Sequence, residues 1–478
     1  MNKLPNVSSP SCLKEIEKVV CIGYFDTMSS KPTISFERFK MPVIIALIAL
    51  LVRMMLIVWM PDAYQFDAYQ RWAGRDHLYI QVWLPATQTL VWLVGKLGGT
   101  PVVLRIVFSM LGAFTIGMMV QLAVSMRESM DDTNDTLVTT SFRSWLWLSL
   151  PFVVFGPYVV WSSVPYQEST LLLFLMGGLL LHRVKPEWGD LCIGALALVR
   201  YEGWPLIVVH WLLRRNMKAV ILSSWGMILW LSIKYFGMLT PYMASPDSFS
   251  DWNELSSNLN PRKARHLFRQ LWLMFDSSAA GWFLLAATPM LARWRKWDYR
   301  HWMLFWAFWG QCAALIGWLF SLGIAFSRMI VLPVMIMAPF SILGLLWAWT
   351  RWKKTIWKRR AFIVALIAMS GWTMRDIYID IIAFNKHNRW ERVLVQEIEQ
   401  CEGDVWSIYP RIHNGPRSRH DGCEVVQGLT NLKAGEEFSC VPWGWGGPMA
   451  TIIANWDDET NAYDVERVGG EPDSECPY

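Results

Sequence analysis

The sequence has few charged residues for its length. Only 17% of its 478 residues are charged, whereas a soluble globular domain usually has about 25%, so an ordinary soluble enzyme is excluded. A disordered chain is excluded too, because 14% of the residues are aromatic and 54% are hydrophobic. The hydrophobic residues form blocks close to the ~20 residues that cross a bilayer. The composition therefore predicts a polytopic membrane protein.

The first 40 residues lack both an early hydrophobic core and a small-residue cleavage site. We therefore expect no cleaved signal peptide. Arg38 and Lys40 precede the first apolar block, which favours a cytoplasmic segment over residues 1–40.

Charge is distributed unevenly along the chain. Residues 375–478 contain nine Lys and Arg against 19 Asp and Glu, a net charge of −10, so residues 1–374 have +15. The basic residues occur in short clusters, and each cluster flanks an apolar block. The positive-inside rule explains this placement more simply than nucleic-acid binding does. We therefore expect membrane lipids, and no nucleic acid, as partners.

The apolar blocks predict an all-α transmembrane module over residues 41–374. Leu191–Leu213 lies between two basic loops and contains Gly203 and Pro205 near its middle, so we interpret it as two short helices joined by a break. Counting it twice gives about eleven crossings of about 20 residues each. The other expected spans are Met41–Met60, Val102–Met126, Ser144–Trp161, Glu168–His182, Ala219–Leu239, Gly281–Ala292, Trp302–Ile324, Met329–Trp349 and Ala361–Met374.

An odd number of crossings places three regions outside: residues 61–101, 240–280 and 375–478. The last region contains four of the eight cysteines, as expected in an oxidising compartment. Three disulfide pairings stay open for them, and no CxxC spacing indicates a metal site. Short apolar runs with Gly and Pro between them predict a small extracytoplasmic β-rich domain here. The four cysteines are Cys401, Cys423, Cys440 and Cys476.

Two carboxylates, Asp62 and Asp67, follow the first span directly. A carboxylate held at the membrane face can take a proton from an acceptor hydroxyl. Alternatively, Asp62 caps an interfacial helix and Asp67 pairs with Arg71 four residues on. The aromatic run Tyr79–Pro85 then leads into an amphipathic segment over residues 86–97, which predicts a helix lying in the interface.

Several ionisable residues fall at membrane depth or at its edge. Such residues are costly in a bilayer and are candidates for function, although internal ion pairs that fix helix packing are the alternative. Arg200 and Glu202, two residues apart, cannot face each other on one continuous helix. Glu168 opens a span, and Arg328 lies at the external end of another. Arg53, inside the first span, is interpreted as a packing or snorkelling residue.

The external loop over residues 240–280 contributes two further cations. Arg265 and Arg269 share one face at helical spacing. That face can bind a phosphate through charge-assisted hydrogen bonds, or it can belong to a solvated interfacial helix.

Together these features resemble the GT-C superfamily of integral membrane glycosyltransferases, which use polyprenyl-phosphate-linked sugars. The resemblance covers roughly residues 41–350 and consists of architecture and short motifs. The acidic first external loop, its aromatic-Pro interfacial helix and Arg105 at the start of the second span match. So do Ser162 followed by Glu168, the Arg200-Tyr201-Glu202-Gly203 sequence, similar to the R-x-E-G of many members, and the late Arg328.

The resemblance implies a role for each matching residue. The acidic base falls on Asp62 or Asp67. Many members have adjacent Asp-Glu where this chain has Asp62-Ala63, and the run after Asp67 matches better, so Asp67 is preferred. Arg328, with Arg265 or Arg269, would bind the donor phosphate, and no metal site is carried over. The substrate cavity would be lined by Glu168, Arg200, Glu202, Tyr64, Gln81, Trp83 and Arg105.

The implied activity is inverting transfer of a sugar from a polyprenyl-phosphate donor to an acceptor hydroxyl at the extracytoplasmic membrane face. No cofactor is expected, although dependence on Mg²⁺ or Mn²⁺ stays open, and the acceptor is a glycan, lipid or protein. A lipid or glycolipid transporter or flippase is the alternative, and a non-catalytic scaffold is a third class. We expect a multi-pass protein of the bacterial plasma membrane, with the endoplasmic reticulum as the other candidate.

Overall fold

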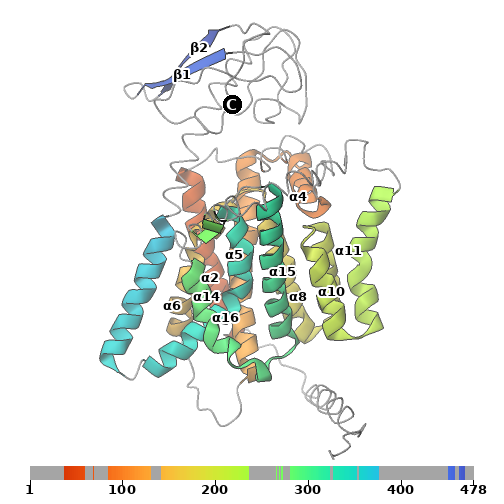
Figure 1. Cartoon of the computed structure of the whole chain (residues 1–478), viewed down its shortest axis with the longest axis vertical. Coiled ribbons are helices and arrows are strands. Elements are labelled where there is room, and N and C mark those ends of the chain that lie inside the picture. The colour runs from red at the N-terminus through yellow and green to blue at the C-terminus, as the bar shows by residue number, and fades with distance from the viewer. Residues whose placement is uncertain are drawn as a thin grey trace, which may run out of the picture. The chain divides into compact units, whose positions relative to one another are not determined.

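The computed structural model describes residues 37–59, 84–130, 142–235, 280–322, 327–352, 355–375, 451–457 and 462–468, with a few single helical positions between them (Figure 1). The chain divides into two units, residues 1–40 and 41–478, and the contacts below lie within the second. The helices are α2 (Glu37–Trp59), α4 (Pro85–Lys96), α5 (Pro101–Met130), α6 (Phe142–Val153), α7 (Gly156–Trp161), α8 (Gln167–Val184), α9 (Pro186–Ala195), α10 (Gly203–Arg214), α11 (Met217–Tyr235), α14 (Ala280–Leu291), α15 (Tyr299–Leu322) and α16 (Val331–Trp352), with a last helix over residues 356–375.

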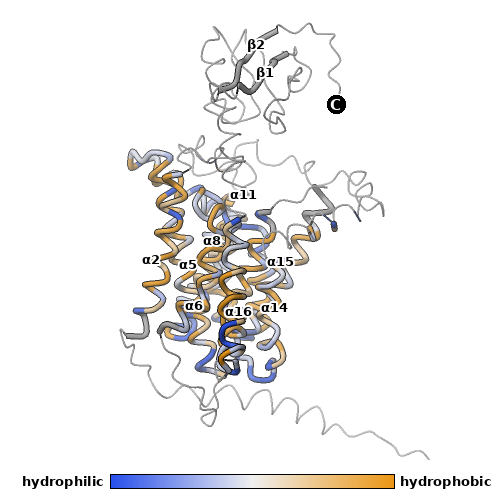
Figure 2. The backbone as a smooth tube through the Cα atoms, turned by 90° about the vertical axis from the view of Figure 1, so that its left-hand side faces the viewer, coloured by the Kyte–Doolittle hydropathy of each residue, from blue (hydrophilic) through white to orange (hydrophobic). Residues whose placement is uncertain are grey.

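Three helices in the described part are long and apolar enough to cross a membrane. They are Lys40–Trp59, Pro101–Met130 and Val331–Trp352, and each coincides with an expected span. Shorter apolar helices cover Ser144–Val153, Met217–Ile233 and Ala280–Leu291. Figure 2 shows apolar stretches along the helices and hydrophilic residues at several of their ends. The described part is thus that of a predominantly helical membrane protein, and the count of about eleven crossings stays a prediction.

The span expected over residues 144–161 is not one continuous helix. The structure divides it into α6 and α7, with Val154 and Phe155 between them. Phe155 has an extended backbone, with φ −61° and ψ 103°. Pro157 in the first turn of α7 has no N–H to donate to the carbonyl of Val153, so a continuous helix would lose a hydrogen bond here.

The break expected within Leu191–Leu213 is confirmed. Helix α9 ends at Ala195, a 3-10 turn covers Leu196–Leu198, and α10 begins at Gly203. A Cβ atom at residue 203 would lie 2.4 Å from the carbonyl oxygen of Leu196, so only glycine fits. The indole Nε1 of Trp204 donates to the carbonyl of Ala197 at 3.1 Å, which satisfies a carbonyl that the interrupted helix leaves without its usual partner.

Helix α16 is the central element of the core. It packs against α14 and α15, and also against α5, α6 and α8, and its first fourteen residues, Val331–Gly344, are all buried. It runs beside α14, where the Ser341 hydroxyl donates to the carbonyl of Phe283 at 2.6 Å. One turn further on, a Cβ atom at Gly344 would lie only 1.7 Å from the carbonyl oxygen of Ala286. Close contact between these two backbones therefore requires glycine at 344.

The described part of the C-terminal region is a two-stranded antiparallel sheet. Strands β1 (Thr451–Asp457) and β2 (Ala462–Val468) pair from Thr451↔Val468 to Asp457↔Ala462. The four cysteines of this region lie outside the described residues. A larger β-rich domain stays a prediction.

We expect Gly344→Ala to lower stability by about 1–3 kcal/mol, because the added methyl group forces α14 away from α16. Gly317→Ala on α15 is the matched control, since a Cβ atom there has nothing within 4 Å, and it should be neutral or stabilising by up to about 1 kcal/mol. Thermal unfolding of both variants in detergent measures the difference. Equal melting temperatures would contradict the close packing of α14 on α16.

Candidate functional site

The candidate site is built around the short connection from α7 to α8. Helix α7 ends at Trp161, Ser162–Pro165 form turns, and the extended Tyr166 precedes α8, which begins at Gln167. Glu168 lies in the first turn of α8, where the positive end of the helix dipole favours a carboxylate. Its side chain is 2% exposed. A buried carboxylate of this kind needs cationic partners.

Arg200 is the first of these partners. Its Nη1 atom lies 2.6 Å from Oε1 of Glu168, and its Nη2 atom lies 2.6 Å from Oε1 of Glu202. The Nε atom also donates to Oε2 of Glu202 at 3.1 Å, which completes a two-point contact. The break between α9 and α10 explains how residues two apart in sequence face each other. The internal ion pairs considered from the sequence are therefore present.

Arg328 is the second partner, and it comes from a distant part of the chain. It lies in the 3-10 turn Ser327–Ile330 that precedes α16. Its Nε atom is 3.1 Å from Oε1 of Glu168, and its guanidinium lies over the ring of Tyr166, 4.5 Å from the ring centre. One carboxylate oxygen thus receives two guanidinium groups, from Arg200 and Arg328. The Arg328 side chain is 26% exposed, the most accessible of the four charged groups.

Two fully buried arginines also contact the connection from α7 to α8. Arg105 on α5 donates from Nε to the carbonyl of Ser163 at 3.2 Å. Arg53 on α2 donates from Nε to the Ser162 hydroxyl at 2.8 Å and from Nη1 to the carbonyl of Ala49 at 3.0 Å. The guanidinium of Arg53 also lies 5.1 Å from the ring centre of Tyr158.

The snorkelling interpretation of Arg53 is therefore wrong, because its charged end is buried inside the protein. The packing interpretation is confirmed. An arginine in the middle of an apolar block was the only signal in the sequence, and it did not reveal that Ser162 is the partner.

Other predicted site residues are not brought to this cluster by the described contacts. Arg265 and Arg269 are both helical and exposed, so their phosphate role stays a prediction. Helix α4 covers nearly the same residues as the expected interfacial helix. The side chain of Gln88 on α4 donates to the carbonyl of Arg71 at 3.2 Å. Five predicted residues lie outside the described part of the chain: Asp62, Asp67, Tyr64, Gln81 and Trp83.

A second buried polar cluster, which the sequence analysis missed, centres on Asp190 of α9. Its Oδ1 atom lies 3.2 Å from Nε2 of His210, 3.7 Å from Nε of Arg214 and 4.0 Å from Nε2 of His182. The Nδ1 atom of His210 is 2.5 Å from the Tyr299 hydroxyl. These contacts join the ends of α8 and α10 to the beginnings of α9 and α15. Isolated His and Asp residues at the ends of apolar blocks were the available signal.

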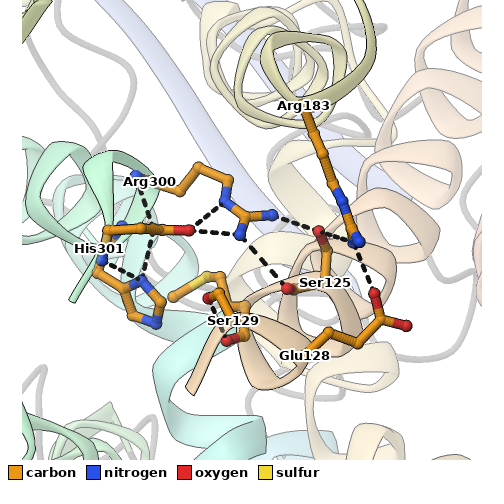
Figure 3. A network of polar contacts seen from close by, with 8 residues as sticks. Ser125, Glu128, Ser129, Arg183, Arg300 and His301 are labelled. Atoms are coloured by element: carbon orange, nitrogen blue, oxygen red, sulfur yellow. Dashed lines mark hydrogen bonds and ion pairs between the residues drawn. The ribbon is translucent and has the colours of Figure 1, made fainter. Parts of the chain in front are cut away.

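Next to this cluster, a network joins α5, α8 and α15 (Figure 3). Arg183 contacts the Ser125 hydroxyl at 2.9 Å and Oε2 of Glu128 at 2.6 Å. Arg300 donates to the same hydroxyl and to Asp298. Although burial opposes the charged form, the hydrogen bond from His301 and the charge of Arg300 hold the pKa of Asp298 well below its usual range. The arrangement ties three helices together at one end.

Neither cluster is a recognisable metal centre. Among the residues that the structure describes, no group of three or more His, Cys, Asp or Glu side chains is arranged to hold a metal ion. The free cysteines in the described part, Cys192 and Cys312, are half-buried and lie on different helices.

In comparisons with known proteins, no protein-family model, no curated protein and no solved structure matches the chain.

We expect Asp190→Ala to lower stability by about 3–5 kcal/mol, because it leaves the Arg214 guanidinium without its counter-charge and His210 without its carboxylate neighbour. Glu187→Ala on the same helix is the matched control, since Glu187 forms only an exposed pair with Lys218, and exposed pairs contribute little. Thermal unfolding should show a large shift for the first variant and none for the second. Similar shifts in both would argue against a stabilising role for the Asp190 cluster.

Proposed function

We propose that this protein is an inverting glycosyltransferase of the GT-C type, transferring a sugar from a polyprenyl-phosphate donor to an acceptor hydroxyl. One observation supports the proposal above the others. The sequence indicated three candidate residues from separate segments, Glu168, Arg200 and Arg328. In the structure, the guanidinium groups of Arg200 and Arg328 both contact Oε1 of Glu168.

The position of the cluster along the helices also supports the proposal. Glu168 opens α8 and Arg328 precedes α16, and the charge pattern predicts that both of these ends are extracytoplasmic. The Asp190 cluster lies at the opposite end of α8, beside His182. A lipid-linked sugar presents its reactive bond at the membrane face, where a cationic group on an accessible rim can reach the phosphate.

In the proposed reaction, a first-loop carboxylate, Asp67 or Asp62, accepts the proton of the acceptor hydroxyl. The acceptor oxygen attacks the anomeric carbon as the bond from that carbon to the phosphate oxygen breaks, and the polyprenyl phosphate leaves with the bonding electron pair. A single displacement inverts the configuration at the anomeric carbon. Arg328 would stabilise the charge on the departing phosphate, which is usually a larger effect than proton abstraction.

A lipid or glycolipid flippase is the second candidate, and the broken α9–α10 hairpin favours it. Discontinuous helices with charges at membrane depth are typical of transporters. Transporters are, however, often built from two related halves, and this sequence shows no convincing internal repeat. The two candidates differ in chemistry, because a flippase breaks no bond in its lipid substrate.

We expect the purified protein to release free polyprenyl phosphate from at least one member of a panel of polyprenyl-phosphate sugars. Arg328→Gln should lower kcat/KM by about 10²–10³-fold, because the leaving phosphate loses a positive partner. Arg351→Gln at the other end of α16 is the control, since Arg351 is exposed and lies over Trp347, and it should retain full activity. A wild-type protein that moves lipids across vesicles but cleaves none of the panel would support the flippase.

Replacement of the first-loop acids tests the base. We expect one of Asp62→Asn and Asp67→Asn to lower kcat by about 10²–10⁴-fold, because proton abstraction is lost, while the affinity for the donor stays unchanged. The other variant serves as its control, since it makes the same Asp→Asn change in the same loop. Full turnover in both variants would exclude these two residues as the base.

A further inference from the structure

The two oxygens of the Glu168 carboxylate have different surroundings. Oε1 receives Nη1 of Arg200 at 2.6 Å and Nε of Arg328 at 3.1 Å. Oε2 is buried and has no hydrogen-bond partner among the residues that the structure describes. Glu202 provides a comparison within the same cluster, because both of its oxygens are bonded to Arg200, at 2.6 and 3.1 Å.

A buried carboxylate oxygen without a donor is unfavourable, because it has lost its hydrogen bonds to water and gained none in return. Such atoms are uncommon in folded proteins, and a role in function is one explanation for them. The partner of Oε2 must be a hydrogen-bond donor, since an ionised carboxylate only accepts. A cationic partner is disfavoured, because Arg200 and Arg328 already lie against the same group. A hydroxyl is the neutral donor that a sugar supplies.

We propose that Oε2 of Glu168 accepts a hydrogen bond from a hydroxyl of the donor sugar, and that this contact selects among sugars. The inference rests on the proposed function. Arg328 connects the proposed phosphate site with the proposed sugar contact. It would bind the donor phosphate, and it is also paired with Oε1 of Glu168. The sugar is attached directly to that phosphate, so its ring hydroxyls lie within a few ångströms of any group paired with the phosphate ligand.

The test compares a donor that the wild-type protein uses with its monodeoxy analogues, each lacking one ring hydroxyl. One analogue should reduce kcat/KM of the wild type by about 10–100-fold, as expected for a hydrogen bond to a charged group. In Glu168→Gln, which keeps the size of the side chain but weakens the acceptor, the same deletion should cost less than about threefold. The effects of the other deletions should be the same in both proteins.

Glu202→Gln is the matched control, since Glu202 is also paired with Arg200 but has both oxygens engaged. It should discriminate between the analogues as the wild type does, even where its overall activity falls. If Glu168→Gln does not fold, Glu168→Asp keeps the charge and withdraws the carboxylate by one methylene group. This variant should lose the same discrimination.

The outcomes separate this inference from the proposed function. A wild-type protein that cleaves no polyprenyl-phosphate sugar overturns both. A protein that is active, but whose Glu168 variants respond to every analogue as the wild type does, overturns only the Glu168 assignment. In that case Oε2 is satisfied by water alone. Equal loss of discrimination in the Glu168 and Glu202 variants would also overturn it, because the effect would then belong to Arg200.

Discussion

The ion pair between Arg200 and Glu168 is the constraint on which the arrangement of the site depends. A guanidinium at membrane depth is tolerated only where a counter-charge is supplied, and the distance of 2.6 Å requires the α9–α10 hairpin to lie against the beginning of α8. Arg328 then brings the turn before α16 to the same oxygen. One carboxylate therefore fixes three segments that are far apart in sequence.

Polar groups gather at both ends of the helices, and they differ in character. Around the connection from α7 to α8, arginines from α2 and α5 donate to Ser162 and Ser163, and an accessible cation remains at the rim. At the other end, Asp190 and Asp298 are surrounded by basic partners that link helices to one another. We propose a ligand for the first arrangement and interpret the second as structural.

Much of the helical framework could be predicted from hydrophobic blocks and flanking charges. The break before Gly203 could be predicted because two basic loops flank one apolar stretch. Helix α16 could be predicted because its apolar run is uninterrupted. The division of residues 144–161 could have been predicted from Pro157, since its effect on the preceding turn is local.

The site was only partly predictable. Glu168, Arg200 and Arg328 could be chosen as candidates because they are ionisable residues within or next to apolar blocks. Their contact with one another depends on tertiary packing. The buried location of Arg53 and the grouping of Asp190 with His210 and Tyr299 likewise come from helix packing, which no local pattern encodes.

The contact of Trp204 with the carbonyl of Ala197 has a consequence for the turn between α9 and α10. Together with the backbone hydrogen bonds from Gly203 to Arg200 and from Trp204 to Tyr201, at 2.9 and 3.1 Å, it braces the interruption on both sides. These three hydrogen bonds stabilise the turn that separates α9 from α10. The turn that carries Arg200 is therefore closed by hydrogen bonds of its own, in addition to the ion pairs that Arg200 forms with Glu168 and Glu202.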